Sequence, residues 1–241
     1  MTCPLTKGFH VHTTARQNCQ QFFDCYGPSI QQAQAEVTVI EIGSQDVNGS
    51  IRSCCPERFK YIGVDFVAGK GVDVVLDDPY ALPFPDHSVD VVLSSSCLEH
   101  SEMFWLTFLE ILRVLKPSGL CYLNVPSNGS FHRYPVDCWR FYPDSGRALI
   151  TWAKRNGIQA ALLESYTSAQ TEDQWNDFVA VIAKDEERAR AYPRRILDTK
   201  ADFTNGIVGG KEGFMKLSEL PEDLRKLMAI GQIVNNRIKI L

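Results

Sequence analysis

Two acidic residues stand at the ends of apolar runs in this sequence, in positions that suit the binding of a nucleoside. Asp65 ends the run that begins at Lys60, 22 residues after Gly43, and an acid at this spacing can accept both hydroxyls of a ribose. Asp78 follows the next run and is placed to accept from an exocyclic amine, with the ring of Tyr80 beside it to flank a purine. Taken singly, Asp65 is also compatible with a helix N-cap, and Asp78 with an ordinary turn.

A glycine-bearing turn precedes these acids, in the segment Glu41-Ile-Gly43-Ser-Gln-Asp-Val-Asn-Gly49-Ser50. Gly43 allows the backbone to approach a ligand closely, and Gly49 is expected to start a helix. A strand, a tight turn and a helix N-terminus together would bring backbone N–H groups to the carboxyl edge of a sheet, where open α/β folds bind ligands. An ordinary strand-to-helix turn explains the same residues, because glycine turns are common.

A second group of reactive side chains lies at residues 126–143, which are dense in His, Asp, Arg and aromatic residues. Loops on a rigid scaffold are where function concentrates. His132 and Asp137 would form a pair in which the histidine takes the proton of an attacking hydroxyl group. The alternative is that Asp137 and Arg140 only hold the loop in place, while its aromatic residues pack against the sheet.

His100, in Leu98-Glu-His100, is the other candidate base, provided that it reaches the proton it removes. His10, His12 and His87 have no supporting partners in the sequence. A metal site built on His132 and Asp137 lacks a third ligand at helical spacing, so no metal is expected.

The elements that would position these residues follow from hydrophobic periodicity. Apolar runs bounded by turn residues predict buried strands at 37–42, 60–64, 72–76, 89–93, 120–125, 160–164 and 177–183. Spacings of three and four predict helices at 106–115 and 218–228, and Asp144 as an N-cap with Gly157 at the C′ position predicts a helix at 144–156. Asn205-Gly206 and Gly209-Gly210 are predicted to be turns. Strands that alternate with helices predict an α/β fold with a parallel sheet between helices.

Six short motifs, in order over roughly residues 37–125, resemble those of the class I S-adenosylmethionine-dependent methyltransferases, in the methyltransferase type 11-like group with a DVNGS turn. They are Glu41-Ile-Gly43, Gly63-Val-Asp65, Asp78 before Leu82-Pro-Phe84, Asp90-Val-Val, Leu98-Glu-His100 and Leu115-Lys-Pro-Ser-Gly119. Each motif is weak alone, but six in register are specific. This chain departs from the family's usual turn by having Gln45 and Val47 at two glycine positions, with Gly49 as a possible compensation.

The resemblance implies a Rossmann-like sheet of seven mostly parallel strands with helices on both faces, its last strand antiparallel at 177–183. It also implies an N-terminal cap at 1–36, a core at 37–185 and a C-terminal extension at 186–241 that serves as a lid or an interaction segment. The cofactor would be S-adenosylmethionine. The residues that would bind it are Glu41, Gly43, Ser44 and Gln45 toward the methionine end, Asp65 at the ribose, Asp78 and Tyr80 at the adenine, Ser94 and Ser95 near the sulfonium, and Phe66.

Composition narrows the possible partners and compartment. The 241 residues include 25 Lys plus Arg and 29 Asp plus Glu, a net charge of −4 that argues against broad binding of nucleic acid or an anionic membrane. No apolar stretch approaches the roughly 18 residues of a membrane span, and the N-terminus shows no apolar signal segment. The eight cysteines are scattered without a C-x-x-C pair, which favours reduced thiols in a cytoplasmic protein.

These features together predict a methyltransferase that acts on a small molecule or a glycan, more readily at oxygen than at nitrogen or carbon, because a hydroxyl must lose a proton and the loop offers a base. One alternative is an NAD-dependent oxidoreductase, whose G-x-G-x-x-G turn this chain does not provide. Another is a non-catalytic protein that keeps the fold and uses its tails as an interaction surface. The sequence leaves the oligomeric state open.

Overall fold

A computed structural model of the chain describes residues 13–33, 35–47, 49–171 and 175–235. The strands are β1 Thr38–Ile42, β2 Lys60–Asp65, β3 Val74–Val75, β4 Val89–Ser95, β5 Leu115–Pro126, β6 Ala161–Ser168, β7 Asp177–Ala183 and β8 Phe203–Val208. The α-helices are α1 Thr13–Ala33, α2 Phe104–Val114, α3 Ser145–Arg155 and α4 Glu222–Val234. Four short 3₁₀ helices are η1 Arg52–Cys54, η2 Leu98–His100, η3 Arg188–Ala191 and η4 Ile196–Asp198.

The strands form one sheet in the order β3-β2-β1-β4-β5-β7-β6-β8. Strands β1 to β5 pair in parallel, and β7 is antiparallel to both β5 and β6. The α/β class, the mostly parallel sheet and the antiparallel strand at 177–183 are therefore confirmed. Parallel pairing gathers the carboxyl ends of β1, β2, β3, β4 and β5 at a single edge, and the predicted site residues lie along it.

The sheet has eight strands rather than the expected seven, because β8 pairs antiparallel with β6 at the outer edge. The prediction of a turn at Asn205-Gly206 is wrong, since both residues lie inside β8. Asn205 has a φ of +52° there, and its side chain accepts from Ser218 N at 2.7 Å and donates to Ser218 O at 3.0 Å. Asn adopts a positive φ more readily than most residues, and for that reason it often marks a turn. Here the positive φ of Asn205 makes an edge strand irregular instead.

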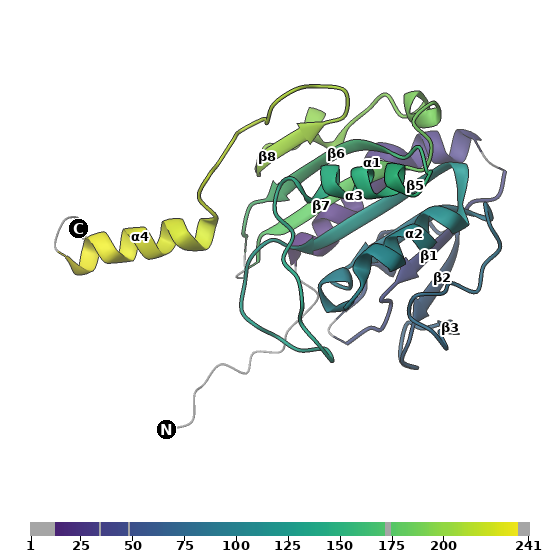
Figure 1. Cartoon of the computed structure of the whole chain (residues 1–241), viewed down its shortest axis with the longest axis horizontal. Helices are drawn as coiled ribbons and strands as arrows, with labels where there is room; N and C mark the ends of the chain where they lie inside the picture. Colours follow the sequence, from purple (N-terminus) through teal and green to yellow (C-terminus); the bar gives the residue numbers. More distant parts are fainter. Residues whose placement is uncertain (1–12, 34, 48, 172–174, 236–241) are drawn as a thin grey trace.

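Helices cover both faces of the sheet, as Figure 1 shows, with α1 behind it and α2 and α3 in front. On one face, Phe22 and Tyr26 of α1 pack against side chains such as Tyr122 of β5. On the other face, α2 and α3 bury residues such as Phe108 and Leu149. The buried positions of α1 recur at spacings of three and four, so one stripe of this helix faces the sheet.

Between β1 and β2, the described residues contain only the 3₁₀ helix η1, so the expected α-helix starting near Gly49 is absent. The side chain of Asp46 accepts from Gly49 N at 2.8 Å and closes a local turn. This bond orders the turn locally, and the chain then continues into η1 rather than into an α-helix. The helices predicted at 106–115 and 144–156 are present as α2 and α3.

Helix α4 projects away from the rest of the chain in Figure 1. Its apolar residues Leu224, Leu227, Met228 and Ile230 are all exposed, so they take no part in the core. Among the residues described, no helix combines the length and apolar character needed to cross a membrane.

Candidate functional site

The register of the strands brings the predicted cofactor residues to the same edge. Ile42, the last residue of β1, pairs with Val64 on one side and with Ser94 on the other. Asp65 pairs with Val75, and the backbone N–H of the next residue after β3 donates to the Asp65 carbonyl at 2.8 Å. The turn after β1 therefore lies between the ends of β2 and β4.

Asp65 is tied to the turn that follows β1. Its carboxylate, 8% exposed, accepts from Gln45 N at 3.1 Å and from Val67 N at 3.2 Å. Since a carboxylate has about four lone-pair sites, it retains capacity to accept from a ligand. The acid and the turn are thus joined by a hydrogen bond at the carboxyl edge of the sheet.

The turn after β1 is tightly packed at Gly43, and it buries the hydroxyl group of Ser44. Gly43 has a φ of +79°, and a Cβ on it would lie 2.5 Å from Cβ of Cys97, so only glycine fits. The buried hydroxyl oxygen of Ser44 has no hydrogen-bond partner among the described residues. This hydroxyl lies next to Gly63 of β2, where a Cβ would be 2.7 Å from it, so the turn holds an unsatisfied polar atom near the end of β2.

Asp78, Tyr80 and Phe66 follow β3 and β2 at the same edge. The Asp78 carboxylate is exposed and accepts from Tyr80 N at 2.8 Å, while the Tyr80 hydroxyl accepts from Met103 N at 3.2 Å. Phe66 is 47% exposed directly after Asp65. An exposed aromatic ring beside an acid suits one face of a purine.

Glu41 and the two serines lie deeper at the same edge. The Glu41 carboxylate accepts from the Tyr61 hydroxyl at 2.5 Å, and burial raises the pKa of Glu41 to about 7. Ser94 is fully buried and Ser95 is partly exposed at the end of β4. The Glu41 side chain is therefore already engaged within the protein.

The long loop after β5 is held against η2 and β7. Backbone N–H groups of Cys138 and Trp139 donate to the Glu99 carbonyl at 2.8 and 3.2 Å, and Ser127 N donates to Asn176 O at 2.7 Å. A Cβ on Gly129, whose φ is +102°, would lie 1.9 Å from the Trp175 ring. These contacts hold the loop, and with it His132, at the carboxyl edge of the parallel strands.

His132 and Asp137 are neighbours, as predicted. The Asp137 carboxylate accepts from His132 N at 2.7 Å and lies 3.4 Å from His132 Nδ1. Arg140 donates to both carboxylate oxygens at 2.6 and 2.9 Å, and this pairing is the main cause that lowers the pKa of Asp137 to about 2. Asp137 thus holds the loop through its ion pair with Arg140, and its carboxylate also lies next to Nδ1 of His132.

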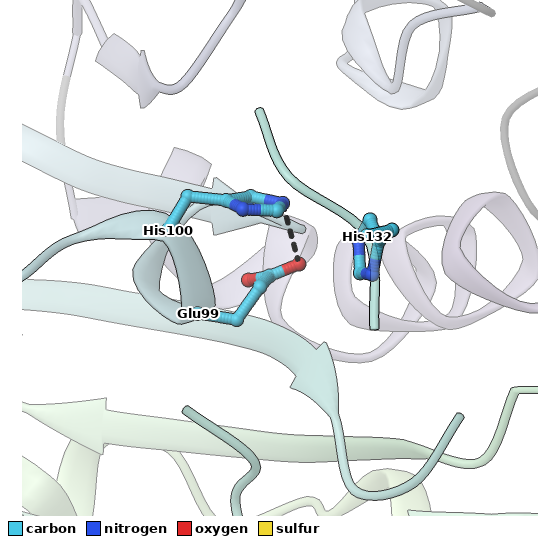
Figure 2. A group of neighbouring side chains, drawn as sticks. All are labelled: Glu99, His100 and His132. Carbon is cyan, nitrogen blue, oxygen red and sulfur yellow. Dashed lines mark ion pairs between the residues drawn. The ribbon is translucent and has the colours of Figure 1, made fainter. Parts of the chain in front are cut away.

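The structure brings His100 next to His132, although the sequence offered them as separate candidates. Their rings meet edge to face, with centroids 4.9 Å apart. Figure 2 shows Glu99 and His100 on one turn, with His132 facing them from the loop. His100 Nε2 lies 3.7 Å from Glu99 Oε1, and His100 Nδ1 lies 2.5 Å from the Val136 carbonyl oxygen. Burial lowers the pKa of His100, which keeps the imidazole neutral.

Glu99 is the functional candidate that sequence reasoning did not select. Its side chain is 1% exposed, its Oε2 has no hydrogen-bond partner among the described residues, and burial raises its pKa to about 8. The Leu98-Glu-His100 motif contained this residue, but nothing in the sequence shows that its carboxylate turns inward. Cys97, against Gly43, and Trp175, against Gly129, were also not singled out.

Comparisons with known proteins give a consistent result for the first half of the chain. Residues 28–123 match the model of a family described as methyltransferase domain. An uncharacterized methyltransferase of Mycobacterium avium is 34% identical over 115 residues, which are 47% of this chain and 44% of that protein. An uncharacterized methyltransferase of Mycobacterium tuberculosis is 41% identical over 69 residues, 29% of this chain and 27% of the relative. The chain thus spans less than half the length of these relatives.

Solved structures of similar fold are more distant. A Burkholderia thailandensis 1,6-didemethyltoxoflavin-N1-methyltransferase with bound 1,6-didemethyltoxoflavin and S-adenosylhomocysteine is 15% identical, with a TM-score of 0.48, over 77% of this chain and 94% of that chain. The Bacillus YcgJ protein is 14% identical, with a TM-score of 0.45, over 68% of this chain and 99% of that chain.

Proposed function

We propose that the methyltransferase domain of this chain, matched to its family over residues 28–123, methylates a hydroxyl group of a small molecule or a glycan with S-adenosylmethionine. The observation that carries this proposal is the Asp65 carboxylate, which is bonded to Gln45 N in the turn after β1. The buried, unpartnered Ser44 hydroxyl beside this turn supports it. Both features suit a nucleoside that has a polar tail.

The residues at the sheet edge are assigned to parts of the cofactor by their positions. Asp65 would accept the ribose hydroxyls, and the Gly43 turn would receive the methionine end. The full set consists of Glu41, Gly43, Ser44 and Gln45 toward the methionine end, Asp65 and Phe66 at the ribose and adenine, Asp78 and Tyr80 at the adenine, and Ser94 and Ser95 near the sulfonium.

Bound S-adenosylmethionine supplies a methyl group on a sulfonium, whose carbon–sulfur bond breaks with its electron pair left on sulfur as the acceptor oxygen attacks. The protein must hold the acceptor in line with that bond, and such alignment can contribute about 7–11 kcal/mol. His132 is proposed to take the hydroxyl proton, with Asp137 behind its Nδ1, and His100 is the second candidate. His100 lies beside the buried Glu99 on the same turn, and His132 faces both from the loop.

An apolar cavity next to the loop is suited to the acceptor. Its volume is about 420 Å³, and its lining includes the rings of Phe104, Trp105, Trp139 and Trp152. Ligand sites are mostly apolar with a few directed polar groups, and Arg140 supplies such a group here. This surface favours a ring-shaped acceptor over an extended polymer.

The terminal segments are proposed to complete the site. Thr14 of α1 donates to the Asp177 carboxylate at 2.7 Å, which places the start of this helix beside the loop-bearing edge. A lid that excludes water would draw on this segment and on residues 186–241. The described cysteines are all free thiols, which favours a reducing, cytoplasmic location.

The proposal is tested by calorimetry with S-adenosylhomocysteine. We expect saturable binding, weakened in Asp65→Asn by roughly 10- to 100-fold, the equivalent of about 1–3 kcal/mol for a lost charge-assisted hydrogen bond. Asp223→Asn, on the outlying α4, is the matched control and should bind as the wild type does. Unchanged affinity in Asp65→Asn would contradict the assignment of this acid.

Transfer itself is tested with S-adenosylmethionine that carries a labelled methyl group, offered with hydroxyl-bearing and amine-bearing small molecules and oligosaccharides. Label is expected in hydroxyl-bearing acceptors only. Binding of S-adenosylhomocysteine without transfer to any acceptor, together with cofactor-independent capture of a protein partner, would point to the non-catalytic alternative.

A further inference from the structure

The cluster of Glu99, His100 and His132 has the composition of a metal site. One carboxylate oxygen and two imidazole nitrogens, one from each residue, all lie within 4.8 Å of one another. Glu99 Oε1 and His100 Nε2 are 3.7 Å apart. Ligand atoms bound at about 2.1 Å around a tetrahedral cation are separated by about 3.4 Å, so this pair is already near that spacing.

The third ligand comes from the long loop, which the sequence spacing did not reveal. The His132 side chain is 37% exposed and lies opposite the turn that carries the other two residues (Figure 2). Its ligand nitrogen lies within 4.8 Å of the other two ligand atoms, against a spacing of about 3.4 Å around a bound ion. The exposed side of His132 leaves coordination positions open to a second molecule.

Hydrogen bonds already fix the two imidazoles in the tautomer that ligates through Nε2. His100 Nδ1 lies 2.5 Å from the Val136 carbonyl oxygen, and His132 Nδ1 lies 3.2 Å from the Ser130 carbonyl oxygen and 3.4 Å from Asp137 Oδ2. Since a carbonyl oxygen can only accept, the proton belongs on Nδ1 in both rings. Ligating histidines are typically held in this way by carbonyl and carboxylate partners.

The charges around the cluster also call for a cation. Glu99 is 1% exposed, and its Oε2 has no partner among the described residues. The charged groups that act on it are Asp137, Asp177 and Arg140, one guanidinium against three carboxylates in total. A buried carboxylate is costly unless it is protonated, fully hydrogen-bonded or paired with a cation, and a bound metal ion would take the place of the proton.

We propose that Glu99, His100 and His132 bind one divalent transition-metal ion, such as Zn²⁺, Co²⁺ or Fe²⁺, that coordinates the hydroxyl group of the methyl acceptor. Two imidazoles and one carboxylate select such ions over Mg²⁺ and Ca²⁺, which prefer all-oxygen ligands. The assignment of the ion to the acceptor rests on the function proposed above. With the ion bound, the histidines are ligands rather than bases, and the coordinated hydroxyl releases its proton to water because the ion lowers the pKa of that group.

The test is a titration of the full chain, freed of metal by a chelator, with Co²⁺ followed by its visible absorption, and with Zn²⁺ in competition. We expect one ion per chain, and an affinity lower by at least about tenfold in Glu99→Gln and in His132→Ala. His87→Asn is the matched control, because His87 is exposed at the far end of β4 and its φ of 57° suits Asn. It should bind Co²⁺ as the wild type does.

His132→Ala decides the matter if Glu99→Gln fails to fold, since the His132 side chain is partly exposed. No saturable Co²⁺ binding, or equal binding by the wild type and His132→Ala, overturns the proposal. Calorimetry with S-adenosylhomocysteine on the same metal-free protein separates the two hypotheses. Binding of S-adenosylhomocysteine without Co²⁺ binding refutes only the metal site. Co²⁺ binding without S-adenosylhomocysteine binding leaves the metal site standing, but refutes the proposed function and with it the assignment of the ion to a methyl acceptor.

Discussion

Burial sets the ionisation of Glu41, the acid near the end of β1. Its folded-state pKa is about 7, against 4.5 for an ordinary glutamate, and desolvation is the largest cause. The Tyr61 hydroxyl, which donates to the carboxylate, and nearby Arg52 oppose the shift without cancelling it. The folded chain therefore binds a proton here that the unfolded chain has already lost between about pH 4.5 and 7.

This raised pKa predicts a loss of stability as the pH rises. The contribution of Glu41 is fully present below pH 4.5 and is gone above pH 7. Between pH 5 and pH 8, the free energy of unfolding of the wild type should fall by about 2 kcal/mol more than that of Glu41→Gln. Urea denaturation at the two pH values measures the difference. Parallel pH profiles for the two proteins would show that Glu41 is ionised throughout.

The long loop after β5 depends on one buried ion pair. Asp137, whose side chain is 2% exposed, is joined to Arg140 by two hydrogen bonds and also accepts from the backbone of His132. Loss of the negative charge would loosen the loop that carries His132 without touching the turn after β1. The effect should therefore fall on the acceptor side of the site.

Asp137→Asn is accordingly expected to lower turnover by roughly 10- to 100-fold, as for other residues that orient a functional histidine. The affinity for S-adenosylhomocysteine should stay at its wild-type value. Steady-state rates and calorimetry on the same protein check the two statements. A variant with wild-type turnover, or one that has lost cofactor affinity, would show that Asp137 does not act through the loop.

Strand β6 is joined to the N-terminal helix and to η4 through Glu164. This fully buried carboxylate accepts from the Tyr26 hydroxyl at 2.5 Å and from the backbone N–H groups of Ile196 and Leu197 at 2.7 and 3.0 Å. All three groups donate to the Glu164 carboxylate, which when ionised can only accept hydrogen bonds. A side chain with its own N–H donors cannot replace it.

Glu164→Gln should lower the free energy of unfolding by about 2–3 kcal/mol, because its amide N–H₂ would face a backbone donor in a buried site. Tyr26→Phe is the matched control, since it removes one of the three bonds and should cost only about 1 kcal/mol. Urea denaturation at pH 7 compares the two. Equal losses would mean that the backbone bonds to η4 contribute nothing.

The chain as a whole divides into a packed body and the outlying α4. Residues as far as Ser218 are tied to β8, through Asn205 and through the pairing of Gly206 with Met215. Helix α4 beyond them exposes its apolar side chains and reaches the body through Lys226, which donates to Gln170. Its removal should therefore leave the core intact.

Removal of residues 221–241, which include α4, is expected to shift the melting temperature by less than about 2 °C. The apolar side chains of α4 are exposed, so few buried contacts are lost. A longer truncation before Phe203 also removes β8 and should lower the melting temperature by about 10 °C or more. Differential scanning calorimetry measures both. A large drop for the shorter truncation would reveal that α4 stabilises the fold by contacts with the body or with another chain.

The sequence by itself determined the order and kind of most elements, and the residues at the sheet edge. Apolar runs marked the parallel strands because burial on both faces leaves a local signature, and a period of three and four marked α2 for the same reason. Helix α3 was marked by the residues at its two ends, Asp144 and Gly157. Asp65 and the Gly43 turn were placed correctly relative to each other because parallel strands end at a common edge. The roles of these residues in binding remain predictions.

Only the tertiary structure decided the features that depend on contacts between distant segments. Asn205-Gly206 entered an edge strand instead of a turn, because β8 pairs with β6. The meeting of His100 with His132 required β4 and β5 to pair and the loop to fold back onto η2. Periodicity reports how each residue is buried, but it carries no information on which buried side chains face one another.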